Sequence, residues 1–302
     1  PSKLALTAKQ AASTTCGRLS GQPMEQMPEP EKGNAMSYYF QHQTSPEIKE
    51  AAERNTLILL PVGQIEEHGP HLPLECDCII ARETARAVAE EIAPEIPVLV
   101  LPTVWTAYTV QQVARWPGLI TFREPEPMIQ MIYDILASLV QNGFRRIVIV
   151  NAHGNNPAIL ELACRKIGSD YDVFPALTYV LGMSKTIGPK VRKSELGGCG
   201  GHAGEEETAL LLHLSPDLVR MDRATDQDIV QYQTRFFPGD IYSEIPDRVS
   251  GLYWSTWGVV ESETGVYGDP TAATAKTGKA LFDEIVKNYA AFLREYCAHG
   301  AS

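Results

Sequence analysis

Residues with metal-binding side chains are concentrated in one short stretch of this 302-residue chain. Positions 66–77 read EEHGPHLPLECD, which holds two histidines, three glutamates and one aspartate. Carboxylates bind divalent cations, and imidazoles are the commonest nitrogen ligands. The stretch directly follows Leu57–Val62, an apolar run typical of a buried strand. We therefore predict a hydrolytic metal centre where this strand gives way to a loop.

A second segment, NAHGNN at 151–156, follows the apolar run Ile147–Val150. His153 would extend from a strand end toward the same site, and Gly154 would let the backbone pass close to a bound group. The alternative is a histidine that caps the next helix, but Asn155 and Asn156 are better capping residues. We therefore predict that His153 is a metal ligand.

The third segment reads GGCGGHAGEEET at 197–208 and leads into an apolar helix. Glutamates near a helix N-terminus are favourable in themselves, which could account for Glu205 and Glu206. That explanation accounts less well for His202 and Glu207, which are five positions apart at the proposed site. The pattern Gly-x-Gly-x-x-Ala at 198–203 does not indicate a dinucleotide site, because the charged residues before it form no strand.

The remaining pattern alternates apolar strands with amphipathic helices, which indicates a parallel sheet covered on both faces. Ligands of such sheets bind beyond the carboxyl ends of the strands, where the three segments fall. The predicted strands are 57–62, 97–104, 146–151 and 173–180. The predicted helices are 79–92, 127–142 and 157–167, one from near Ala203, and a last one over about 272–296.

Composition limits the classes of partner. The net charge of −11 argues against nucleic acid and anionic membranes as partners. No apolar run spans a bilayer, and the N-terminus has no secretory signal pattern. The six cysteines show no CxxC pair, so a reduced, cytoplasmic protein is expected. Cys76 and Cys78, in what we predict to be an extended segment, would point away from Asp77 as small buried residues.

Residues 1–36 are polar and interrupted by prolines, so we expect a tail or an arm that lies on another subunit. Residues 37–302 would form a single domain. From Thr225 to Gly258 no element can be placed.

Four blocks, in order over about residues 50–295, resemble the creatininase (creatinine amidohydrolase) family. They read PVGQIEEHGPHLPLECD, VNAHGNN, GHAGEEET and GVYGDPTAATAKTG. The resemblance implies a three-layer α/β/α domain around a mainly parallel sheet. It also implies a homo-oligomeric hydrolase with two divalent metal ions (Zn, Mn or Fe) beneath a small polar substrate. The metal ligands it implies are Glu66, His68, Asp77 and His153. Asp77 would bridge the ions, and His202 would be catalytic and contact the substrate.

The chain departs from the family pattern at three places. Creatininase has a glutamate where this chain has Asn155, so the second ion must lose a ligand or take one from Glu207. The place of the tryptophan that stacks on the substrate reads Gly197–Gly201, and Val113 replaces a histidine found in many relatives. Creatinine is therefore not the expected substrate.

The leading hypothesis is hydrolysis of a C–N (amide) bond in a small polar cyclic substrate by attack of a metal-bound hydroxide on a carbonyl. His202, Glu67 or Glu207 would pass the proton. One alternative is hydrolytic C–C cleavage of a cyclic diketone derived from inositol, as in 3-dehydro-scyllo-inosose hydrolases. Another is a binding protein without turnover. The residues predicted to contact substrate are Asn155, Gly201, His71 (alternatively a partner that orients a ligand) and Trp116 (alternatively a core residue).

Overall fold

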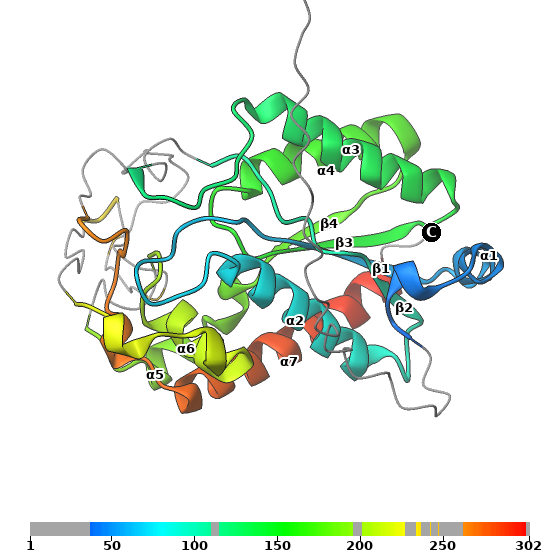
Figure 1. Cartoon of the computed structure of the whole chain (residues 1–302). Coiled ribbons are helices and arrows are strands. Elements are labelled where there is room, and N and C mark those ends of the chain that lie inside the picture. The colour runs from blue at the N-terminus through cyan, green and yellow to red at the C-terminus, as the bar shows by residue number, and fades with distance from the viewer. Residues whose placement is uncertain are drawn as a thin grey trace, which may run out of the picture. The chain divides into compact units, whose positions relative to one another are not determined.

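The computed structural model describes residues 37–109, 115–195, 201–226, 234–236, 242, 247 and 262–299. Its described part contains a sheet of four parallel strands in the order β2-β1-β3-β4 (Figure 1). The strands are β1 (Leu57–Val62), β2 (Val98–Val100), β3 (Arg146–Asn151) and β4 (Ala176–Tyr179). The predicted bounds of β1 and β3 are confirmed. β2 and β4 are shorter than predicted because Pro102 and Pro175, which have no N–H to donate, flank them.

Alternate residues of the central strands face opposite sides of the sheet, as the two-residue period of a strand requires. Leu57 and Leu59 pack into the cluster formed with α2 (Cys76–Ile92), α6 (Glu205–Leu214) and α7 (Ala275–His299). The intervening residues Ile58 and Leu60 pack into a second cluster, formed with α3 (Pro125–Gln141) and α4 (Pro157–Tyr171). Helices thus cover both faces of a parallel sheet (Figure 1), which confirms the predicted α/β/α architecture.

Helix α2 begins at Cys76, three residues earlier than predicted. Cys76, Asp77 and Cys78 therefore lie in the first turn of a helix, and the predicted extended segment is wrong. The loop before the helix closes in a turn at Pro73, whose carbonyl accepts from the Cys76 amide at 3.1 Å. Helical geometry can therefore begin at Cys76. Both cysteines are nevertheless buried, as predicted.

Helix α1 (Ser45–Glu53) was not predicted. Its start carries a capping box, in which Glu47 Oε2 accepts from the backbone N–H of Thr44 at 2.6 Å. The shorter helical segments are η1 (Phe40–His42), η3 (Leu181–Ser184), α5 (Gly188–Val191), η4 (Pro216–Leu218), η5 (Met221–Arg223) and η6 (Pro270–Ala272).

Some features that bear on the predictions lie outside the described residues. These are the N-terminal segment 1–36, Val113, the glycine-rich residues 197–200 and most of 225–258. Among the described helices, none is both long and apolar enough to cross a membrane.

Candidate metal centre

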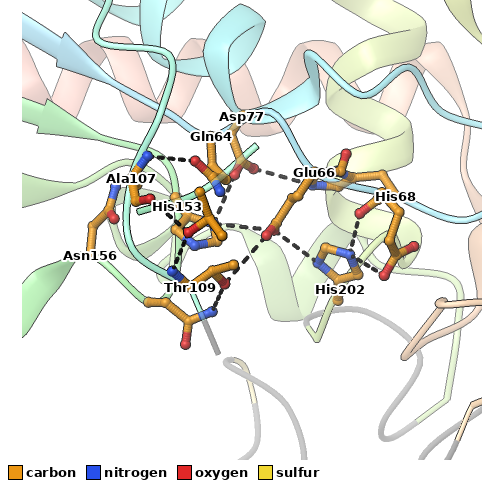
Figure 2. Close-up of polar contacts among 12 residues, drawn as sticks. Gln64, Glu66, His68, Asp77, Ala107, Thr109, His153, Asn156 and His202 are labelled. Carbon is orange, nitrogen blue, oxygen red and sulfur yellow. Dashed lines mark hydrogen bonds and ion pairs between the residues drawn. The ribbon is translucent and has the colours of Figure 1, made fainter. Parts of the chain in front are cut away.

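Three segments distant in sequence bring the predicted metal ligands together beyond the carboxyl ends of β1 and β3 (Figure 2). Glu66 and His68 lie in the loop after β1, and Asp77 lies in the first turn of α2. His153 follows the end of β3 by two residues. Glu207 lies in the first turn of α6. All five side chains are buried.

The carboxylate of Asp77 lies between two imidazoles. Its Oδ1 is 3.2 Å from Nε2 of His68, and its Oδ2 is 2.9 Å from Nδ1 of His153. The two oxygens therefore face imidazoles that come from different segments. This is the arrangement in which one carboxylate can be shared by two adjacent ions.

Two sets of potential metal ligands, which we call the donor groups, share Asp77. One contains Glu66, Asp77 and His153, and the other contains His68, Asp77 and Glu207; within each group the ligand atoms lie within 4.8 Å of one another. In the first group, His153 Nδ1 is 3.2 Å from Glu66 Oε1. In the second, His68 Nε2 is 4.0 Å from Glu207 Oε2. A third candidate group joins Glu66 and His68 to His202.

Backbone contacts fix the direction of two predicted ligand side chains. His68 Nδ1 lies 3.3 Å from the carbonyl oxygen of Glu66, which can only accept, so Nδ1 carries the hydrogen. Nε2 of His68 then has its lone pair toward Asp77, as a metal ligand requires. Oε2 of Glu207 accepts from the Ala203 amide at 2.6 Å, which holds this carboxylate toward the same point.

Mutual electrostatics shift the pKa values of these groups in the metal-free protein. Burial alone would lower the pKa of His153, but the carboxylates of Glu66 and Asp77 outweigh burial and raise it to about 10. Burial would raise the pKa of Asp77, whereas His68 and His153 hold it well below its usual range. The pKa of Glu207 is raised by burial.

His202 lies at the edge of this group, with its ring centroid 4.4 Å from that of His68. Its Nδ1 is 3.7 Å from Glu66 Oε1, and its Nε2 is 2.7 Å from the carbonyl oxygen of Glu67. Burial would lower the pKa of His202, but its contact with Glu67 and the charge of Glu66 raise it to about 10. Glu67 thus contacts His202 through both its backbone carbonyl and its carboxylate.

The residues predicted to contact substrate lie in different settings. Nε2 of buried His71 is 2.9 Å from Oγ1 of Thr208, the residue that follows Glu207 in sequence. Burial, with repulsion from His68 and His202, lowers its pKa to about 4. The role of His71, toward a ligand or toward a substrate, stays a prediction.

The other three predicted contact residues are less buried. Half-buried Asn155 donates from Nδ2 to Thr109 Oγ1 at 2.9 Å. Half-buried Trp116 donates its indole N–H to the carbonyl of Glu263 at 3.3 Å. Gly201 is exposed and precedes the backbone bridge between His202 and Tyr267. Whether they meet a substrate likewise stays a prediction.

Sequence reasoning missed two residues beside the donor groups. Thr109 Oγ1 lies 3.5 Å from Glu66 Oε2, and Gln64 Oε1 accepts from the amide of Ala107 at 2.6 Å (Figure 2). Gln64 precedes Glu66 by two positions, and two positions is the side-chain period of an extended chain, so its proximity was open to inference. No comparable signal marks Thr109, which comes from the segment after β2.

The donor set fits divalent cations. Among the described residues, the ion pairs of Glu66, Asp77 and Glu207 are all with histidines. Buried carboxylates need a cationic partner, because transfer of a charge out of water is costly. Oxygen and imidazole nitrogen are also the ligand atoms that Zn and Mn take in proteins.

A family model described as "Creatininase: Creatinine amidohydrolase" matches residues 41–293. The chain belongs to the creatininase family. The resemblance inferred from the four sequence blocks is thereby confirmed. With its buried histidine and carboxylate groups, this family member is a metal-dependent, amidohydrolase-like enzyme, so the hypothesis of a binding protein without turnover is not retained.

Relatives within the family differ in what they act on. A 3-dehydro-scyllo-inosose hydrolase of Thermotoga maritima is 28% identical over 82% of this chain and 81% of its own length. A mycofactocin precursor peptide peptidase of Mycobacterium tuberculosis is 32% identical over 76% of this chain and 81% of its own length. The crystal structure of a creatinine amidohydrolase superposes with a TM-score of 0.70 at 23% identity, over 86% of this chain and 98% of that one. That last likeness supports the fold.

Proposed function

We propose that the protein hydrolyses a C–N (amide) bond of a small polar, cyclic substrate with two divalent metal ions. The observation that carries this proposal is the position of Asp77, with one oxygen toward His68 and the other toward His153. Glu66 and His153 would complete the site of one ion, and His68 and Glu207 that of the other. Solved creatininases named as a Mn form and a Zn–Zn type favour these metals.

The bound ions would supply Lewis acidity toward a carbonyl and lower the pKa of water toward 7. The protein itself supplies orientation and proton transfer. The three carboxylates of the donor groups would offset part of the charge of the ions. His202 lies next to the donor groups and is not itself needed to complete either of them, so we assign it the proton transfer to the leaving nitrogen.

A second candidate is hydrolytic C–C cleavage of a cyclic diketone derived from inositol. The likeness to the inosose hydrolase of Thermotoga maritima, which extends over 82% of this chain, favours it. The same donor groups would serve, because both reactions begin with attack of water on a carbonyl. The peptidase relative instead favours C–N cleavage, with an open-chain peptide as a third type of substrate.

A substrate panel separates these possibilities. Metal-free protein is reloaded with Mn or Zn and offered succinimide, dihydrouracil, short peptides and 3-dehydro-scyllo-inosose. We expect turnover of a cyclic amide that is lost in chelator and restored by the metal. Turnover of the inosose alone would favour the second candidate, and full activity in chelator would contradict the metal mechanism.

A further inference from the structure

We infer that Glu67 and Gly265 hold His202 as the Nε2–H tautomer, so that Nδ1 is the atom through which His202 acts. This inference rests on the proposed function for the role of His202. It changes the role expected for Glu67, which becomes a positioning residue that works through His202 and does not touch the substrate.

The first observation is the double contact of Glu67 with one ring nitrogen. Nε2 of His202 lies 2.7 Å from the carbonyl oxygen of Glu67 and 3.3 Å from its Oε1. A carbonyl oxygen has no hydrogen to give, so Nε2 must donate. A neutral imidazole has one N–H, and Nδ1 of His202 is then an acceptor.

The second observation is the direction of Nδ1. It lies 3.7 Å from Oε1 of Glu66, on the side of the donor groups (Figure 2). Nε2 faces the carbonyl oxygen of Glu67 instead. The ring stands 4.4 Å from that of His68, and His202 is 7% exposed. Rotation of the ring by half a turn would break the contact with the Glu67 carbonyl. The ring therefore has one favoured orientation, and in it Nδ1 points toward the donor groups.

The third observation explains how the Glu67 carboxylate is held. Its Oε2 accepts from the Gly69 amide at 2.9 Å. Gly265 has φ +87°, and a Cβ at that position would lie 2.1 Å from the same oxygen. Glycine is thus required at 265 both by its backbone conformation and by the space that the carboxylate fills. The backbone bridge between His202 and Tyr267 brings this segment beside the histidine.

The two nitrogens of the His202 imidazole therefore have different roles. Nδ1 accepts a proton from the attacking water and returns it to the leaving nitrogen, so the proton count of the ring is restored after each turnover. The Nε2–H bond to Glu67 is kept throughout. Because the carboxylate faces the ring, it also favours the ring's brief positive charge.

The direct test is the tautomer of His202 in the full-length, Zn-loaded protein. Imidazole ¹⁵N labelling with long-range ¹H–¹⁵N spectra distinguishes a protonated Nε2 from a protonated Nδ1, and His202→Ala identifies the signals. We expect Nε2–H with an unprotonated Nδ1. A protonated Nδ1 with a bare Nε2 in the wild-type protein would overturn the inference. The measurement needs no substrate, so it stands apart from failure of the substrate panel.

Two variants test the holding residues. Glu67→Ala removes the carboxylate but keeps the backbone carbonyl that accepts from Nε2, so it should leave the metal count per chain and the Nε2–H tautomer unchanged. On the panel compound that wild type hydrolyses, it should lower kcat about 10- to 100-fold with little change in KM. Glu67→Gln keeps an acceptor oxygen but carries no negative charge, so it should recover only part of the lost kcat. An unchanged kcat in Glu67→Ala would show that the carboxylate does not act through His202.

Gly265→Ala should displace the Glu67 carboxylate and so lower kcat as Glu67→Ala does. Gly182→Ala is the matched control, since a Cβ at 182 would meet only ordinary contacts, the nearest at 3.7 Å. If Gly265→Ala does not fold, the wild-type spectrum and Glu67→Ala still decide the inference.

Discussion

Nδ1 of His153 lies 2.9 Å from Oδ2 of Asp77, although 76 positions separate the two residues in sequence. The pairing of β1 with β3 explains this proximity. Val62 and Asn151 are register partners at the ends of these adjacent parallel strands. The loops after β1 and β3 therefore begin at neighbouring points of the sheet edge. Helix α2 begins near that edge, which places Asp77 beside His153. Sheet topology, more than local sequence, assembles the donor groups.

Asp77 should control binding of both metal ions. Asp77→Asn keeps the size of the side chain and one acceptor oxygen, but it replaces the other oxygen with an amide that cannot bind a cation. We expect the metal count to fall at both sites and kcat/KM to drop by at least about 100-fold. Elemental analysis of the dialysed protein measures the loss, with circular dichroism as the control for folding. Retention of two ions per chain would contradict a shared role for Asp77.

Glu207 should affect only one of the two ions. It belongs to the group with His68 and Asp77, whereas the group with Glu66 and His153 does not contain it. We expect Glu207→Gln to lower the metal content to about half and to leave one tight site. Glu205→Gln is the matched control from the same helical turn, because Glu205 accepts from the amides of Lys193 and Ser194 instead. An unchanged stoichiometry in Glu207→Gln would exclude Glu207 as an essential ligand.

The strand positions and the three site segments were predictable from sequence, and the exact geometry around them was not. The continuous apolar run Leu57–Val62 favoured a buried strand, and the predicted bounds were correct. The start of α2 was missed because the loop-like sequence before Asp77 conceals a helical turn. Thr109 was missed for another reason: it reaches Glu66 only through the tertiary path of the segment after β2. Contacts of that kind depend on tertiary packing, which the periodicity of apolar residues in the sequence does not predict.

Metal-free protein should lose stability as the pH rises above neutrality. The pKa of His153 is about 10 in the folded state, above the value of about 6.5 expected after unfolding. The folded state therefore binds more protons between these values. Its stabilisation is present below about pH 6.5 and is lost as the pH rises through 10. Thermal unfolding at pH 7, 8 and 9 should show a falling midpoint.

Two controls belong to that pH experiment. His153→Gln should weaken the dependence, because one titrating ring is gone while His202, whose pKa is also raised to about 10, remains. Metal-loaded protein should show a weaker loss over the same range, since the ion replaces the proton on the ligand. Calorimetry in buffers with different ionisation enthalpies should correspondingly detect proton release on metal binding. A midpoint that rises from pH 7 to 9 in the metal-free protein would contradict the assignment.

Contact between α6 and α7 should set the position of Glu207. A Cβ at Gly278 would lie 1.8 Å from the carbonyl oxygen of Ala209, so the two helices pack closer there than any side chain allows. Gly278→Ala must push the helices apart, and overpacking of this kind costs about 1–3 kcal/mol. Because Glu207 lies two residues before Ala209, the same shift should weaken the metal site that contains Glu207. Urea unfolding and metal titration measure the two effects, and Gly182→Ala serves again as the tolerated control. Full stability in Gly278→Ala would show that the helices can separate without cost. A loss of stability with unchanged metal affinity would show that the position of Glu207 does not depend on this contact.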